Sequence, residues 1–150
     1  MTDLVFMMGN FEARIPADRS YCDFHMWLKK IEGSVYTVGF TSFSVRLLKD
    51  VYFLDWLIDA ETTVTKKKEI GEVESSKALS TLYAPFNGKI IEFNELLMDD
   101  PSLINSGNYD KGWLFTLETD ETLMSPEEYV LFLESKWDET ERHLKGQINE

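Results

Sequence analysis

Short runs of β-branched and aromatic residues, separated by Gly, Asn and Pro, constrain the fold of this chain more than any other feature. Runs of this length and composition are typical of β-strands, because amphipathic helices need longer segments with apolar residues three and four apart. The Asn87-Gly88 pair predicts a hairpin turn between two of these runs. The predicted strands are His25–Lys30, Val35–Phe40, Val51–Ile58, Ile70–Val73, Leu79–Tyr83, Lys89–Phe93 and Gly112–Leu117. Many short strands joined by turns favour a mostly β fold, a hybrid of flattened β-barrel and β-sandwich.

Helical signals are confined to three segments. Thr41–Lys49 has apolar residues at helical spacing and begins with residues able to cap a helix. Asn94–Met98 fits a short helical turn. Ser125 and Glu128 form a capping-box pattern around Pro126, which suits the first position of a helix, and an amphipathic run follows. The β fold is therefore expected to carry short helices and one C-terminal α-helix.

The length of 150 residues fits one domain, 1–150. Residues 1–19 are broken by glycine and proline and are predicted to form an irregular N-terminal extension. The β core is expected over 20–124, and a C-terminal helix and tail over 125–150. The tail from Asp138 onward is mostly polar and is expected to fray.

The charge balance limits the classes of partner. Lys and Arg total 15 and Asp and Glu total 27, a net charge of −12, so the basic surface typical of nucleic-acid binding is missing. No apolar run reaches the length of roughly 20 residues that a membrane span needs, and the first residues lack the basic segment of a secretory signal. A single cysteine suits a reducing compartment. We expect a cytoplasmic protein, most simply a monomer, without nucleic-acid or membrane partners.

Residues for metal binding or nucleophilic catalysis are few. The only soft metal ligands are Cys22, His25 and His143. Cys22 and His25 are three apart in a segment predicted to be extended, which would point them to opposite faces. The acidic pairs at 99–100 and 127–128 are explained by a turn and a helix start. We therefore expect no catalytic residue and no metal site.

One lysine stands out by its surroundings. Lys77 lies in GEVESSKALS, between the strands predicted at 70–73 and 79–83, and is framed by the small residues Ser75, Ser76 and Ala78. A hairpin would hold such a lysine at a fixed height, and small neighbours would leave it open to a modifying enzyme. An unmodified surface lysine is the plainer alternative for a lysine in a polar turn.

The Glu74-Ser75-x-Lys77-Ala78 motif resembles the attachment site of the glycine cleavage H protein family, in which the lysine carries lipoate on such a hairpin. Further segments similar to the family are His25-x-Trp27, Val38-Gly39-x-Thr41, Tyr83-x-Pro85-x-x-Gly88, Asn94-Glu95, Pro101-x-Leu103-x-Asn105, Tyr109-x-x-Gly112-Trp113 and Leu123–Tyr129. The resemblance covers about residues 20–135. It implies a lipoyl-domain-like fold, lipoate joined covalently to Lys77, an attachment motif of Glu74, Ser75, Ser76 and Ala78, and a cleft near His25 that shelters the arm.

The family resemblance also implies a function. The protein would catalyse nothing itself and would shuttle the aminomethyl group of glycine on its lipoyl-lysine arm. The implied partners are glycine decarboxylase, aminomethyltransferase, dihydrolipoamide dehydrogenase and a lipoate-attaching enzyme. In biotin carriers, which share the general architecture, methionines typically flank the lysine; Ser76 and Ala78 occupy those positions here, which favours lipoate.

Two alternatives remain open from the sequence. Met26 stands where the family usually has Glu, and Leu48-Lys49-Asp50 stands where Leu-Gly-Asp is common. An H-like lipoate-binding protein that carries sulfur intermediates in a heterodisulfide-reductase-like sulfur-oxidation pathway would use the same Lys77 with other partners. A non-lipoylated H-like scaffold would only bind proteins.

Overall fold

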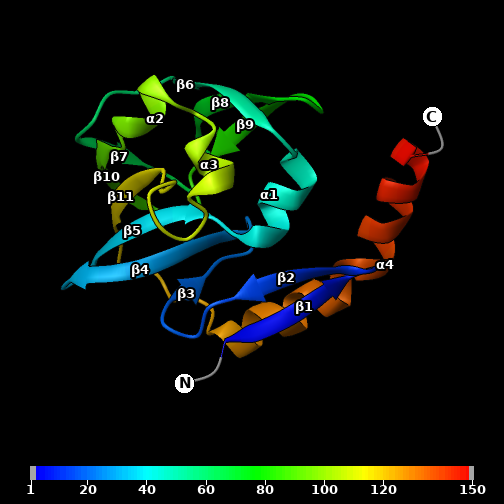
Figure 1. Ribbon diagram of the computed structural model, residues 1–150. Helices are drawn as coiled ribbons and strands as arrows, with labels where there is room; N and C mark the ends of the chain where they lie inside the picture. The colour runs from blue at the N-terminus through cyan, green and yellow to red at the C-terminus, as the bar shows by residue number, and fades with distance from the viewer. Residues whose placement is uncertain (1–2, 149–150) are drawn as a thin grey trace.

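The computed structural model describes residues 3–148, with side chains described up to residue 137. Within that range the chain forms eleven strands and four helices, so the fold is mostly β, as predicted (Figure 1). The strands are β1 (Leu4–Met8), β2 (Phe11–Ile15), β3 (Ser20–Tyr21), β4 (Met26–Glu32), β5 (Val35–Phe40), β6 (Val51–Trp56), β7 (Thr62–Val64), β8 (Glu69–Ser75), β9 (Leu79–Tyr83), β10 (Gly88–Phe93) and β11 (Phe115–Glu118). The helices are α1 (Ser42–Leu48), α2 (Leu96–Asp99), α3 (Leu103–Ser106) and α4 (Pro126–Ile148).

The described strands form three sheets. Six strands pair in the order β3-β4-β5-β11-β10-β7, three in the order β6-β8-β9, and β1 pairs only with β2. The two larger sheets pack face to face, and their inward side chains share one core: Leu28, Val38 and Leu117 from the first sheet, Leu54, Val73 and Leu82 from the second. The sheets do not close on themselves, so the arrangement is the sandwich form of the predicted hybrid.

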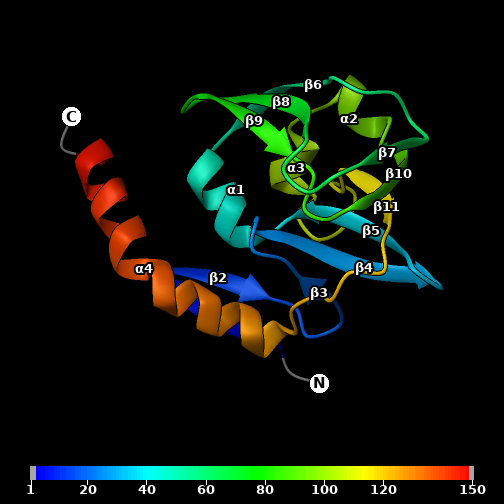
Figure 2. The same ribbon diagram turned by 180° about the vertical axis from the view of Figure 1, so that it is seen from behind.

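From residue 3 onward the N-terminal extension is not irregular, which corrects the sequence-based expectation for residues 1–19. The β1 and β2 strands form an antiparallel hairpin around Gly9 and Asn10, and Gly9 has the positive φ of 63° that such a tight turn requires. Phe6 and Met8 on one face of the hairpin are buried in a second apolar cluster with residues of α4. Figure 2 shows the hairpin lying along α4. Buried and exposed residues alternate along both strands, as expected for strands with one buried face. That face is buried only because α4 packs against it.

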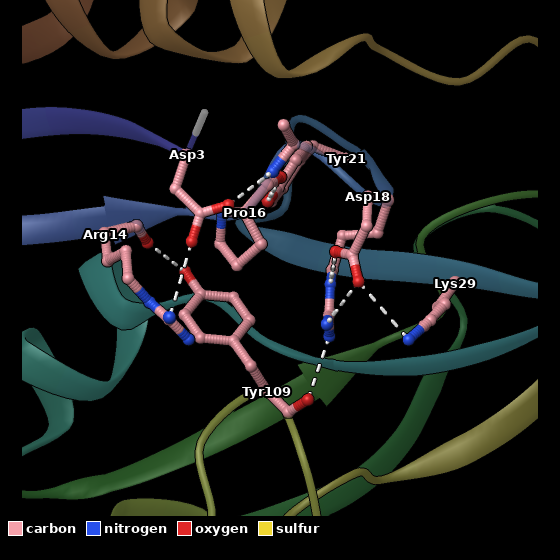
Figure 3. A network of polar contacts seen from close by, with 9 residues as sticks. Asp3, Arg14, Pro16, Asp18, Tyr21, Lys29 and Tyr109 are labelled. Atoms are coloured by element: carbon pink, nitrogen blue, oxygen red, sulfur yellow. Dashed lines mark hydrogen bonds and ion pairs between the residues drawn. The ribbon is translucent and has the colours of Figure 1, made fainter. Parts of the chain in front are cut away.

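A network of polar contacts fastens the hairpin to the body (Figure 3). The Tyr21 hydroxyl donates to the Pro16 carbonyl at 2.6 Å, and the Tyr109 hydroxyl donates to the Arg14 carbonyl at 2.6 Å. The Arg19 guanidinium in turn donates to the Tyr109 carbonyl at 2.9 Å. These bonds satisfy buried polar groups at the junction, so the hairpin is part of the folded unit.

The hairpin predicted at Asn87-Gly88 does not exist. Strand β9 belongs to the three-stranded sheet and β10 to the six-stranded sheet, so the chain crosses from one sheet to the other here. Asn87 Oδ1 accepts a hydrogen bond from the Lys66 backbone N–H at 2.8 Å. A Cβ on Gly88 would lie 2.2 Å from the Glu118 carbonyl oxygen. Glycine is therefore needed here because β10 and β11 approach closely, and not because the chain makes a tight turn.

The C-terminal helix begins as predicted. The Ser125 N–H donates to the Glu128 carboxylate at 2.9 Å and the Glu128 N–H donates to Ser125 Oγ at 3.1 Å, a complete capping box. The helix runs on to Ile148 instead of fraying from Asp138, because the segment is rich in strong helix formers. The last two residues of the expected tail lie outside the described residues. No described helix has the length and apolar character needed to cross a bilayer.

Candidate functional site

The lysine-bearing segment is a hairpin loop, as predicted. Glu74 of β8 pairs with Leu79 of β9, and Ser75 to Ala78 connect them. Lys77 is half-buried, while Ser76 and Ala78 on either side of it are exposed. The loop stands at one end of the three-stranded sheet.

Ser75 fixes the shape of this loop. Its side chain is turned inward, with the residue only 3% exposed. Its hydroxyl oxygen accepts from the backbone N–H groups of Lys77 at 3.2 Å and Ala78 at 3.4 Å, and its O–H donates to the Ala78 carbonyl at 3.3 Å. The Ser75 N–H also donates to the Ala78 carbonyl at 3.0 Å. One hydroxyl thus uses its donor and both acceptor positions to lock the backbone on each side of the lysine.

Ser76 ties the loop to the neighbouring strand. Its N–H donates to the Asp50 carbonyl at 2.8 Å, and the Asp50 N–H donates to Ser76 Oγ at 3.3 Å. Asp50 immediately precedes β6, which pairs with β8. The sequence reading missed this contact because the two residues are 26 positions apart.

Glu74 lies on the outer face of the sheet beside the loop. Its carboxylate accepts a hydrogen bond from the Tyr52 hydroxyl at 3.1 Å, and this contact raises the pKa of Tyr52. The register places Glu74 between Phe53 and Leu79, whose side chains are 47% and 61% exposed. The predicted attachment motif therefore adjoins an exposed surface of mixed apolar and acidic character.

His25 is not in an extended segment, which corrects the sequence-based expectation. Its N–H donates to the Cys22 carbonyl at 3.2 Å, its φ is 60°, and strand β4 begins only at Met26. The sulfur of Cys22 is buried, and burial raises the pKa of its thiol to about 12. The thiol is therefore protonated at neutral pH and is no nucleophile. The side chain of His143 lies outside the described side chains.

The His25 ring is enclosed by α1 and α4. Its Nδ1 lies 2.9 Å from the Tyr129 hydroxyl, which lies 3.0 Å from Thr41 Oγ1. The ring stacks on Phe43 with centroids 4.7 Å apart. Burial lowers the pKa of His25 to about 4, so the imidazole is neutral at physiological pH.

A groove connects the region of His25 with the lysine hairpin. A hollow of about 260 Å³ is lined by His25, Met26 and Tyr83 among others, and a second of about 190 Å³ extends to Ser80. Both are lined by Phe40, Thr81 and Leu82, so they adjoin along β9. Thr81 is the third residue of β9, which begins two residues after Lys77. Most of the lining is apolar and aromatic, suited to a hydrocarbon chain.

Comparisons with known proteins agree with one another. Residues 19–136 match the family model described as glycine cleavage H-protein. The glycine cleavage system H protein of Listeria monocytogenes serotype 4a is 41% identical over 125 residues, covering 80% of this chain and 98% of the relative. That of Thermobifida fusca is 37% identical over 125 residues, covering 81% and 98%. The crystal structure of a glycine cleavage system H protein from Mycobacterium marinum superimposes with a TM-score of 0.66 at 36% identity, covering 77% of this chain and 95% of that one. The hairpin of β1 and β2 lies outside the residues that the family model matches.

Proposed function

Because this chain belongs to the glycine cleavage H-protein family, we propose that it works as the lipoylated carrier of the glycine cleavage system, with Lys77 as the attachment residue. The observation that carries the assignment of Lys77 is its place at the tip of a hairpin whose backbone Ser75 locks on both sides. The relatives and the solved structure reported above share one name, so the sulfur-carrying alternative and the scaffold alternative are not favoured.

The residues around Lys77 fit a covalent lipoyl group. Exposed Ser76 and Ala78 leave room for an enzyme to reach the amine, while Ser75 holds the loop still. Attachment through an amide removes the lysine charge. When bound, lipoate supplies a disulfide that accepts and releases the aminomethyl group, and the protein supplies mounting and recognition. Glu74, which is half-buried beside the loop, is a recognition element for the attaching enzyme in this proposal.

The groove along β9 is the proposed resting place of the arm. Its lining runs from Ser80, three residues after Lys77, to His25. His25 is neutral and hydrogen-bonded to Tyr129. Its proposed role is therefore to line the groove and not to transfer protons. Apolar lining by Phe40 and Leu82 favours the hydrocarbon part of the arm.

The proposed partners are glycine decarboxylase, aminomethyltransferase, dihydrolipoamide dehydrogenase and a lipoate-attaching enzyme, and the carrier itself is not an enzyme. Tethering raises the effective concentration of the arm at each docked partner. The net charge of −12 steers the carrier toward basic surfaces on those partners. We place it in the cytoplasm as a monomer.

Mass spectrometry tests the assignment of Lys77. The chain is incubated with lipoate, ATP and a lipoate ligase, and its intact mass is measured together with that of Lys77→Arg. We expect one lipoyl increment on the wild-type chain and none on the variant, with Lys89→Arg as a matched control that still gains it. A wild-type chain that gains no increment refutes both carrier functions.

Glycine–bicarbonate exchange tests the pathway. The lipoylated chain is mixed with glycine decarboxylase from the same source, and exchange of labelled bicarbonate into glycine is measured. We expect exchange that depends on lipoylation of Lys77. A lipoylated chain that supports no exchange rules out glycine cleavage and restores the sulfur-carrying alternative.

A further inference from the structure

Asn105 of α3 braces the lysine loop from a distance. Its Nδ2 donates to the Lys49 carbonyl at 2.6 Å, and its Oδ1 accepts from the Val51 N–H at 2.9 Å. The carboxamide therefore grips the backbone on both sides of Asp50, the residue that holds Ser76.

Each of the two peptide groups that flank Asp50 is bonded at both ends. In the first, the Lys49 carbonyl accepts from Asn105 and the Asp50 N–H donates to Ser76. In the second, the Asp50 carbonyl accepts from the Ser76 N–H and the Val51 N–H donates to Asn105. These four bonds form a continuous connection from α3 through Asp50 to the residue next to Lys77. Bonded chains of this kind polarise and stiffen one another.

The turn before Asp50 needs this support. Lys49 has φ 63° and ψ −144°, a backbone conformation that residues with a side chain rarely adopt. Such a conformation persists only where neighbouring bonds hold it, and the short bond from Asn105 to the Lys49 carbonyl does so. Helix α3 is itself anchored, because its Ile104 side chain is 1% exposed in the main core.

We propose that Asn105 is a positioning residue for Lys77: acting through the peptide groups of Asp50, it fixes Ser76 and so presents the lysine to the enzyme that acylates it. This inference rests on the proposed lipoylation of Lys77. In this role Asn105 acts through the backbone of Lys49, Asp50 and Val51 and through Ser76.

The test compares two asparagines. Asn105→Ala removes the brace, and Asn105→Asp keeps an acceptor for Val51 while it loses the donor to Lys49. Asn108→Ala is the matched control, since Asn108 Nδ2 donates to the Phe40 carbonyl at 2.8 Å, at the end of β5 rather than beside Asp50. The kcat/KM of lipoate ligase for each chain is measured, together with hydrogen exchange of the Ser76 amide and the urea midpoint.

We expect Asn105→Ala to lower kcat/KM by at least about fivefold, the factor expected for one lost hydrogen bond, and to speed exchange of the Ser76 amide. For Asn105→Asp, both the kcat/KM and the exchange rate should lie between those of Asn105→Ala and the wild type. Asn108→Ala should lower the urea midpoint but leave acylation and Ser76 exchange at wild-type rates. Acylation of Asn105→Ala at the wild-type rate, or an equal loss in both alanine variants, overturns the inference while Lys77 stays the attachment residue. A wild-type chain that is not acylated overturns the proposed function and this inference with it.

Discussion

Replacing Lys49 by glycine should stabilise the protein. Lys49 ends α1 with φ 63° and ψ −144°, in a region of backbone conformation that is almost exclusive to glycine. Holding a residue with a Cβ there costs about 2 kcal/mol. Glycine loses more conformational freedom on folding, which costs about 1 kcal/mol. The net gain in the free energy of unfolding is therefore about 1 kcal/mol for Lys49→Gly, equivalent to a rise in Tm of roughly 2–4 °C.

The measurement is urea and thermal unfolding of three chains: the wild type, Lys49→Gly and Lys49→Ala. The alanine variant removes the charged side chain and keeps the Cβ, so its stability should stay within about 0.5 kcal/mol of the wild type. The bonds from Asn105 to the Lys49 carbonyl and the Val51 N–H involve backbone atoms and remain in both variants. If the glycine variant is no more stable than the alanine variant, the reasoning from backbone strain is refuted. The Leu-Gly-Asp pattern common in the family fits the same physical demand.

Three further predictions follow from the site and its supports. Ser75→Ala removes the hydroxyl that locks the loop, so hydrogen exchange at the Lys77 and Ala78 amides should accelerate and lipoylation should slow by at least about fivefold; unchanged exchange would contradict this role. The unfolded chain protonates His25 near pH 6.5 and the folded chain only near pH 4, so acidification through this window favours the unfolded chain. Urea titrations at pH 7 and pH 4.5 should show a loss of about 2 kcal/mol in the wild type that His25→Gln lacks, and equal losses in both would exclude His25 as the cause. A Cβ on Gly112 would lie 2.3 Å from the Leu103 carbonyl oxygen, so Gly112→Ala should lower the free energy of unfolding by about 1–3 kcal/mol, and an unchanged urea midpoint would show that the loop yields without cost.

Features confined to a few neighbouring residues were predictable. The capping box of Ser125 and Glu128 is present with both reciprocal bonds, and the N-cap of α1 is Thr41, whose hydroxyl accepts from the Ser44 N–H at 3.3 Å. The hairpin that carries Lys77 was also predicted, because its two strands follow each other directly in the chain. In each case the bonding partners lie within a few positions, so the sequence pattern contains both of them.

Features that join distant segments were missed or wrong. The alternating apolar residues of β1 and β2 are buried by α4, which lies more than 100 residues later in the chain. The local sequence does not show this partner, so the extension was expected to be irregular. The Asn87-Gly88 pair has the chemistry of a hairpin turn, yet the two flanking strands belong to different sheets. Local turn propensity is worth less than the burial of both strands in a shared core.

The sequence by itself determined that this is a mostly β protein with a lysine on a hairpin between small residues, because those properties depend on local spacing and side-chain size. Only the tertiary structure decided how that lysine is held. The bonds of Ser75 are local to the loop, but those of Ser76 with Asp50, and of Asn105 with Lys49 and Val51, join residues 26 to 56 positions apart and depend on how α3, β6 and the hairpin are brought together. The physical reason is that a hydrogen bond between distant segments forms only after the core has paid the entropy of bringing them together.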